Sequence, residues 1–183
     1  IQKIYNKQLL VPVAEYVPMS DWFPIFKTFN FGQANFSKGI KDVLFEVNNQ
    51  KFSSLICFES TFPEINRRHA KNGADFFTYI VNDGWYTSPP QPQQHMQQSI
   101  YRAIENRKTV LRCANTGISA VIDPNGEVRE KINLNNEGVI TSFIKKTNKS
   151  TFYTNYGNVF AIIMLIIICI LFGKTFIKNE QKI

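Results

Sequence analysis

Cysteine and histidine are scarce in this sequence. Its 183 residues contain three cysteines, Cys57, Cys113 and Cys169, and two histidines, His69 and His95. An odd number of widely spaced cysteines does not make a disulfide framework, and these residues do not have the spacing of a zinc site. The sequence therefore predicts neither a disulfide scaffold nor a metal centre, and we expect no cofactor.

The sequence also lacks a block of lysine and arginine interleaved with aromatic residues. It has 21 Lys+Arg against 14 Asp+Glu, a net charge of +7. Binding to nucleic acid, binding to anionic lipid, or a need for solubility alone would each explain this positive charge. Without such a block, nucleic acid is the least supported partner. The 16 phenylalanines argue against disorder, and the length suits one domain with a hydrophobic core.

The first residues lack the features of a signal peptide. No initiator methionine, charged n-region or apolar h-region precedes the stretch "IYNKQLLVPVAEYVP". We therefore expect this sequence to be the C-terminal part of a larger protein, whose N-terminal part is missing here.

One long apolar run lies near the C-terminus. "VFAIIMLIIICILF", residues 159–172, has 14 apolar residues, and flanking residues extend it toward the roughly 20 that a membrane span needs. We expect a transmembrane helix over residues 156–177; the alternative is a buried core helix, although an all-round apolar terminal helix has nothing obvious to pack against. Cys169 would be inert within it. Three lysines lie on each side, so charge predicts no orientation.

Between the two ends, strand-like and helix-like segments alternate. Strands are predicted at residues 52–57 and 75–82 and in "TVLRCA", "ISAVID", "GEVREKI" and "EGVITSFI". Helices are predicted in "FPEINRRHAKNGA" and in "PQQHMQQSIYRAIENRK", which begins near Pro92 and has an apolar stripe of Met96, Ile100, Ala103 and Ile104. "DPNG" predicts a hairpin turn. This order predicts an α/β layered sheet with mixed pairing over residues 1–144, a polar linker over 145–155, the membrane helix over 156–177 and a polar tail over 178–183.

Cys57 is the first candidate for chemistry. It follows "SSLI", so we expect it at the end of a strand, at the sheet edge where open α/β folds bind ligands. A thiolate nucleophile needs a base or a cation nearby. On the residues alone, a small buried apolar cysteine is the favoured interpretation, and a nucleophile is the alternative. Lys7 and Glu15, taken singly, are typical of surface charges, and His69 is predicted to lie on a solvent-exposed helix face.

Taken together, these segments resemble the nitrilase superfamily and, within it, the bacterial apolipoprotein N-acyltransferases. "ICFES" resembles the nucleophile motif, and "YNKQLLVPVAEYVP" resembles the segment that carries the catalytic lysine. "NDGWY" resembles an active-site loop, and "QHMQQSIYRAIENRKTVLRCANTGISAVIDPNG" matches the helix, strand and hairpin that follow. The resemblance extends from residue 4 to about residue 144. It implies that Cys57 is the nucleophile and Lys7 the catalytic lysine, with Glu15, Glu59 and Phe58 as supporting residues. It also implies that Trp85 and Tyr86 lie on the substrate side of a lid that continues into "TSPPQP", with Gly84 as its hinge. The alternative for this segment is an ordinary surface loop.

Two departures from the family pattern occur. The family usually has Phe-Gly before the supporting glutamate, where this chain has Val13 and Ala14, and usually has tyrosine after the cysteine, where it has Phe58. Both suggest shifted contacts. The family's general-base glutamate lies upstream of the lysine, and no residue of this sequence matches it.

The resemblance also implies a fold, an activity and a location. The fold is a nitrilase-like α-β-β-α layered sandwich, incomplete at its N-terminus, followed by the membrane helix. The activity is transfer of an acyl chain from a phospholipid, through a cysteine thioester, to the α-amino group of a diacylglyceryl lipoprotein, with membrane lipids and the upstream half as partners. The location is the bacterial cytoplasmic membrane, with the catalytic domain on its outer face. The alternatives are a membrane-tethered amidohydrolase and an inactive fragment that binds lipid or partners.

Overall fold

A six-stranded mixed sheet forms the body of the protein. The computed structural model describes residues 3–19, 22, 25, 36–85, 90–144, 147 and 149–180, with side chains up to residue 173. The strands lie side by side in chain order: β1 (Leu44–Val47), β2 (Gln50–Ile56), β3 (Phe76–Val81), β4 (Thr109–Ala114), β5 (Ser119–Ile122) and β6 (Val128–Ile132). The pairs β2–β3 and β3–β4 are parallel and the others antiparallel, which confirms the predicted mixed pairing.

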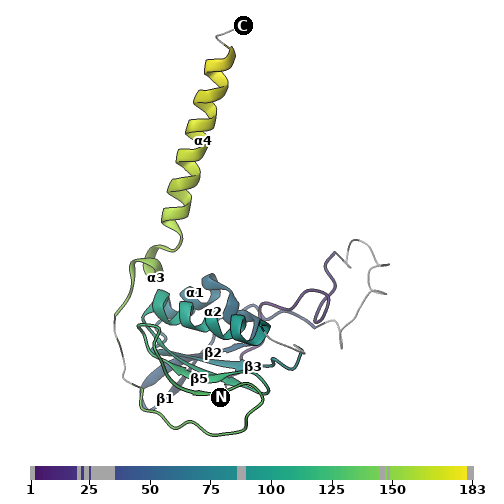
Figure 1. Ribbon diagram of the computed structural model, residues 1–183, viewed down its shortest axis with the longest axis vertical. Coiled ribbons are helices and arrows are strands. Elements are labelled where there is room, and N and C mark those ends of the chain that lie inside the picture. Colours follow the sequence, from purple (N-terminus) through teal and green to yellow (C-terminus); the bar gives the residue numbers. More distant parts are fainter. Residues whose placement is uncertain are drawn as a thin grey trace.

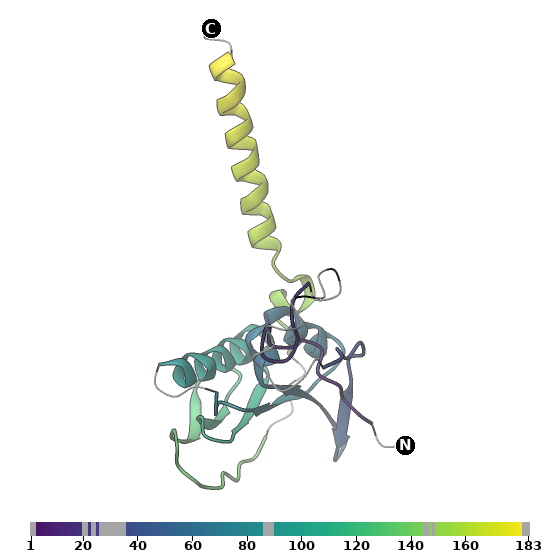
Figure 2. The same cartoon turned by 90° about the vertical axis from the view of Figure 1, so that its right-hand side faces the viewer.

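Helices cover one face of this sheet (Figures 1 and 2). They are the 3-10 turn η2 (Cys57–Thr61) and the helices α1 (Pro63–Lys71), α2 (Gln91–Asn106) and α3 (Phe152–Tyr156). Both α1 and α2 have a proline in their first turn, Pro63 as the first residue of α1 and Pro92 as the second residue of α2, because the missing N–H of proline is not needed there. The core between the layers includes Leu55, Phe77, Tyr79 and Val110 from the strands and Ile65, Met96 and Ala103 from the helices.

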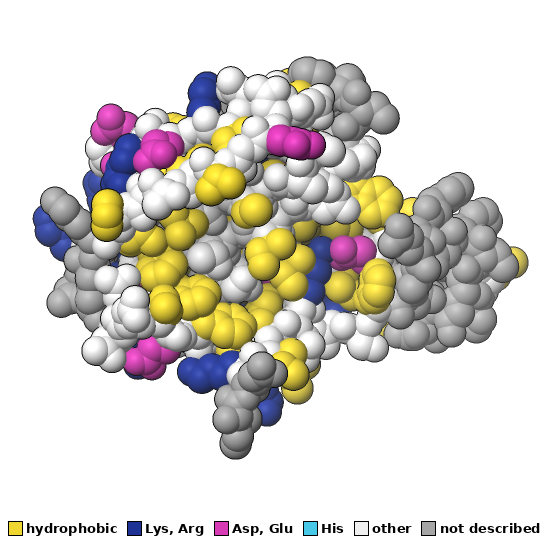
Figure 3. All heavy atoms as spheres, turned by 90° about the horizontal axis from the view of Figure 1, so that it is seen from below, with side chains coloured by type: hydrophobic (Ala, Val, Ile, Leu, Met, Phe, Trp, Pro, Cys, Tyr) yellow, Lys and Arg dark blue, Asp and Glu magenta, His cyan; other side chains and the backbone are white. Residues whose placement is uncertain are grey.

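The opposite face of the sheet is apolar and partly open. The rings of Phe45, Phe52 and Phe76 stack across three strands, with centroids 5.5 and 5.2 Å apart. Further along, Ile80 is 59% exposed and Cys113 is exposed. Figure 3 shows apolar side chains gathered on this underside. The described residues thus make one helical layer and one sheet layer of the predicted sandwich.

Two predictions about elements are wrong. The segment "EGVITSFI" forms no ladder with the described strands. Its neighbour Arg129 of β6 donates side-chain hydrogen bonds to the Ser142 hydroxyl (3.1 Å) and the Phe143 carbonyl (3.0 Å), so a side chain takes the place of backbone pairing. Ile104 is not part of the buried stripe of α2: it is 39% exposed and lies against the turn at Gly126.

The predicted hairpin turn and the connection to the C-terminal helix are well defined. At "DPNG" the Gly126 N–H donates to the Asp123 carbonyl over 2.8 Å, with Gly126 at φ +90°, as predicted. The predicted polar linker contains α3, which docks on the domain because the Thr154 hydroxyl donates to Asn106 (3.1 Å) and Arg67 donates to the Thr154 carbonyl (3.1 Å).

The last helix, α4 (Val159–Glu180), projects away from the body (Figures 1 and 2). Its apolar side chains from Phe160 to Phe172 are largely exposed. Among the residues searched, those that the structure describes, no helix has the length and apolar character needed to cross a membrane. The span predicted over residues 156–177 therefore stays a prediction.

Candidate active site

Cys57 lies where β2 ends and η2 begins, as predicted. Its backbone is left-handed, with φ 51°, which is uncommon for a residue other than glycine and costs roughly 1–3 kcal/mol. The side chain is half-buried, and its thiol lies 3.6 Å from the carbonyl oxygen of Asn82, at the end of β3. The turn thus presents a thiol at the carboxyl edge of two parallel strands, in a backbone conformation that the surrounding structure must maintain.

Lys7 and Glu15 form an ion pair on the segment that precedes the sheet. The ammonium of Lys7 donates to both carboxylate oxygens of Glu15, each over 2.7 Å, and Glu15 also accepts from the Val11 N–H over 2.8 Å. The two side chains are only 11% and 23% exposed. The interpretation of either as an isolated surface charge is therefore wrong. The neighbouring Val13, one of the two departures from the family pattern, has φ 69°, a strained conformation for a β-branched residue.

Glu59 joins this segment to the turn that carries Cys57. Its carboxylate is fully buried and accepts from the Tyr5 hydroxyl (2.7 Å), the Gln8 N–H (2.6 Å), the Leu9 N–H (3.2 Å) and the Ile56 N–H (2.7 Å). Three of these donors flank Lys7 in the sequence, and the fourth directly precedes Cys57. Glu59 is therefore a supporting residue in a literal sense, since one buried carboxylate fixes both segments. Burial, followed by the nearby Glu59 carboxylate, raises the pKa of Tyr5, which keeps its hydroxyl a donor.

A cavity of about 620 Å³ brings the predicted residues together. Lys7, Glu15, Cys57, Phe58 and Trp85 all line it. The other lining residues are mostly apolar: Val11, Ala14, Phe36, Ile56, Ile80, Val81, Asn82, His95 and Asn115. Glu59 lies behind this surface. Tyr86 and residues 87–89 of the predicted lid lie outside the described residues. The arrangement offers a thiol and a paired ammonium on the wall of a mainly apolar pocket.

A buried polar network lies behind Cys57, and the sequence analysis missed it. His95 of α2 is 6% exposed and lies between the Asp83 carboxylate, 2.7 Å from Nδ1, and the Ser60 hydroxyl, 3.0 Å from Nε2. Arg112 of β4 donates to the other oxygen of Asp83 over 2.8 Å. A signal was available, because α2 has polar residues at His95, Ser99, Arg102 and Asn106, and this spacing places them along one face of a helix. All four are buried.

His69, predicted to be exposed, is instead fully buried. Its ring meets the edge of Tyr5 at a centroid distance of 6.0 Å, and its Nε2 lies 3.4 Å from Asp42 without making a hydrogen bond among the described residues. Burial lowers its pKa, although Asp42 acts in the opposite direction. The helix face around His69 is covered by the segment that leads to Lys7, which the local sequence pattern did not indicate.

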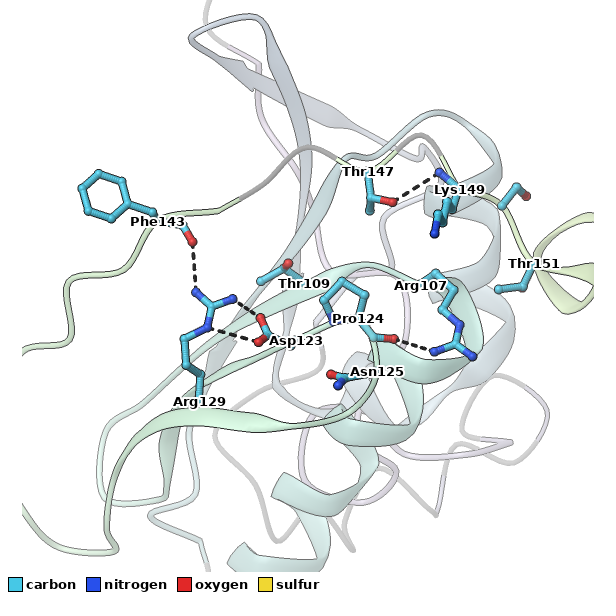
Figure 4. Close-up of a pocket in the computed structure, with 11 residues that line it drawn as sticks. Arg107, Thr109, Asp123, Pro124, Asn125, Arg129, Phe143, Thr147, Lys149 and Thr151 are labelled. Carbon is cyan, nitrogen blue, oxygen red and sulfur yellow. Dashed lines mark hydrogen bonds and ion pairs between the residues drawn. The ribbon is translucent and has the colours of Figure 1, made fainter.

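A larger cavity, of about 1040 Å³, lies between α2, the β5–β6 turn and the linker (Figure 4). Its carboxylate, Asp123, is paired with Arg129, and Arg107 donates to the Pro124 carbonyl over 3.3 Å. None of its lining residues is a predicted catalytic residue. Within the described part of the chain, no group of three His, Cys, Asp or Glu side chains is placed to hold a metal ion.

Comparisons with known proteins identify the family. The chain is 36% identical over 156 residues to apolipoprotein N-acyltransferase of Geobacter metallireducens, covering 85% of this chain and 30% of that protein. It is 36% identical over 169 residues to apolipoprotein N-acyltransferase of Rickettsia prowazekii, covering 91% and 34%. The chain thus spans about a third of the length of these curated relatives.

A solved structure supports the fold. The carbon-nitrogen hydrolase of Helicobacter pylori G27 superposes with a TM-score of 0.51 at 18% identity, over 60% of this chain and 44% of that one. This likeness supports the predicted nitrilase-like α/β fold. The sequence model of the carbon-nitrogen hydrolases matches residues 1–150, which is most of the chain. The chain therefore belongs to the carbon-nitrogen hydrolase family.

Proposed function

We propose that the protein containing this chain transfers an acyl group from a phospholipid to the α-amino group of a diacylglyceryl lipoprotein, through a thioester on Cys57. One observation carries the proposal: Cys57 and the Lys7–Glu15 pair line the same largely apolar cavity. The names of the relatives, which are apolipoprotein N-acyltransferases at 36% identity, support the choice of substrates.

In the first half-reaction the Cys57 thiolate attacks the carbonyl carbon of the phospholipid ester. A bond forms between sulfur and carbon, and the tetrahedral intermediate collapses by expelling the glycerol oxygen, which takes up a proton and leaves as a lysophospholipid. Lys7, whose charge is held in place by Glu15, stabilises the thiolate and the oxyanion of the intermediate. In the second half-reaction the lipoprotein amine attacks the thioester, loses a proton, and releases the Cys57 thiolate.

Both half-reactions need a base that moves these protons. Glu15 and Glu59 are occupied by other partners in the structure, Glu15 by Lys7 and Glu59 by four donors. We therefore assign the base to the glutamate that the resemblance places upstream of residue 1. The apolar lining of the cavity, including Ile80 and Trp85, suits the acyl chain that both half-reactions share.

We also propose that the segment 156–177 anchors the domain in the bacterial cytoplasmic membrane, with the catalytic domain on the outer face. Its described side chains from Phe160 to Phe172 are apolar and largely exposed, so they have no core of their own to bury them. An exposed apolar helix on a domain with a largely apolar cavity suits an enzyme whose donor is a lipid.

Mass spectrometry of the acyl-enzyme tests the function. The full-length protein is incubated with phospholipid of known chain length, and the peptide that carries Cys57 is examined for the added acyl mass. We expect the adduct on Cys57, its loss in Cys57→Ala and Cys57→Ser, and its persistence in the control Cys113→Ser. An adduct on another cysteine, or none at all, would contradict the assignment.

Adding the acceptor separates the alternatives. If the thioester persists until a diacylglyceryl peptide with a free amine is added, the protein is an acyltransferase. If water discharges it equally fast without the peptide, the protein is a membrane-tethered amidohydrolase of the same family. Phospholipid binding without any adduct would indicate a lipid-binding fragment.

A further inference from the structure

The backbone of Cys57 needs support that the proposed chemistry does not itself provide. With φ 51°, Cys57 is held in the left-handed region, and a relaxed backbone would turn its side chain in another direction. Two groups contact its carbonyl: the Ser60 hydroxyl donates to it over 2.7 Å, and Nε2 of His95 lies 3.3 Å from it. Both groups therefore act on the peptide unit that directly follows the nucleophile.

These contacts continue inward as a chain of buried groups. Nδ1 of His95 lies 2.7 Å from an oxygen of Asp83, and because a carboxylate only accepts, Nδ1 carries a proton in this contact. A carbonyl oxygen also only accepts, so Nε2 holds the Cys57 carbonyl as an N–H donor. The second oxygen of Asp83 accepts from Arg112 over 2.8 Å, in an ion pair whose two side chains are fully buried. Arg112 is held in turn by the Ile118 carbonyl, 3.1 Å away. The chain thus ties η2 to α2, to the loop after β3 and to β4.

We propose that Arg112, Asp83, His95 and Ser60 are positioning residues that lock the carbonyl of Cys57 and so keep its thiol turned into the cavity. The proposal rests on the function proposed above, but its geometry depends only on Cys57 being the reactive thiol. The order Ser60–His95–Asp83 resembles a serine hydrolase triad. Ser60 is fully buried and already donates to the Cys57 carbonyl, so it is a structural link and not a second nucleophile.

The test uses the full-length protein with three variants. His95→Ala removes the contact, His95→Gln places an amide near the position of Nε2, and Ser60→Ala removes only the hydroxyl link. The matched control is His69→Gln, which changes the other buried histidine and lies outside the network. Steady-state acyl transfer gives kcat and KM, and thermal unfolding gives the folded fraction. Alkylation of the Cys57 peptide by iodoacetamide, followed by mass spectrometry, reports on the thiol independently of lipid substrates.

We expect His95→Ala to lower kcat by about 10²-fold with KM little changed, since misplacing a reacting group by about 1 Å has an effect of that size. Alkylation of Cys57 should slow by about tenfold for the same reason. His95→Gln should recover part of both losses, and Ser60→Ala should give a smaller loss than His95→Ala. The control His69→Gln should lower the melting temperature and leave kcat within about threefold of the wild type.

Two results would overturn the proposal. If His95→Ala is folded and its kcat and alkylation rate match those of the control, the network is structural only. If His95→Gln is as inactive as His95→Ala while alkylation stays normal, the imidazole transfers protons and does not merely hold the turn. If the wild type forms no acyl-enzyme, the proposed function fails, yet the alkylation rates still decide whether His95 positions Cys57.

Discussion

Replacing Glu59 should separate the Lys7 segment from the turn at Cys57, and the size of the effect follows from the four hydrogen bonds that Glu59 accepts. In Glu59→Gln the amide oxygen can keep the three donors of the Lys7 segment, Tyr5, Gln8 and Leu9, but the amide N–H₂ then faces the Ile56 N–H. One charge-assisted hydrogen bond is lost and two N–H donors face each other, which lowers the free energy of unfolding by about 2 kcal/mol. Glu59→Ala removes all four bonds and leaves three buried N–H groups without partners, which costs on the order of 5 kcal/mol.

Hydrogen exchange measured by mass spectrometry on the full-length protein is a suitable assay, because it reads the two segments separately. A loss of about 2 kcal/mol corresponds to roughly 30-fold faster exchange of the Ile56 amide, which loses its acceptor in Glu59→Gln. Peptides from α2 should be unaffected. The control is Glu64→Gln, whose side chain is 56% exposed and paired with Arg67, so its removal should cost at most about 1 kcal/mol. If Glu59→Gln exchanges like Glu64→Gln, then Glu59 does not join the two segments.

Three further predictions concern the lysine, the buried histidine and the isolated chain. Lys7→Ala should lower the rate of acyl transfer by about 10²–10³, and Lys7→Arg should not restore it, because a planar guanidinium cannot take the place of an ammonium between Glu15 and the oxyanion. Near-normal turnover of Lys7→Ala would show that the lysine has no catalytic role. Burial lowers the pKa of His69, so as the pH falls the unfolded state takes up a proton at a higher pH than the folded state does. The melting temperature should therefore be constant above about pH 7 and fall below about pH 6.5, and His69→Gln should reduce that fall. An equal fall in both proteins would show that His69 is not the group responsible. Residues 1–183 expressed alone should be inactive and aggregation-prone, and co-expression of the upstream part should restore acyl transfer and correct folding; thiol-dependent acyl transfer by purified 1–183 would contradict this.

Local patterns predicted the elements of the sheet and helices well where the signal was also local. The β-branched and aromatic run of β3, the proline at the start of α2 and the "DPNG" turn are each determined by neighbouring residues, and the structure contains all three. The segment "EGVITSFI" has an equally good strand pattern but forms no ladder. A strand needs a partner strand, and in the described part of the chain this segment instead accepts hydrogen bonds from the Arg129 side chain, which no local pattern reports.

The candidate site divides in the same way. The position of Cys57 at a strand end was predictable from the four residues before it. For Lys7 and Glu15 the local sequence indicated only surface charges, and the family resemblance was needed to predict that they belong to one site. His95 lies within a matching motif but was not predicted to be part of the site, because the apolar stripe of α2 is a stronger local signal than the polar residues on its buried face. A buried polar residue is identified by its partners, and the partners of His95, Asp83 and Ser60, lie 12 and 35 positions away in the sequence.

The two buried carboxylates of the site, Glu59 and Asp83, constrain opposite sides of the turn at Cys57. Glu59 accepts from the backbone on the N-terminal side of Cys57 and from the segment of Lys7, so it sets where the ammonium lies relative to the turn. Asp83 acts through His95 on the C-terminal side, so it sets which way the thiol points. Because the two act on opposite sides of one residue, the loss in rate on weakening both should differ from the product of the single losses if they constrain a common geometry. A double variant, Glu59→Gln with His95→Gln, measured against each single variant decides this, and strictly multiplicative losses would show that the lysine and the thiol are positioned independently.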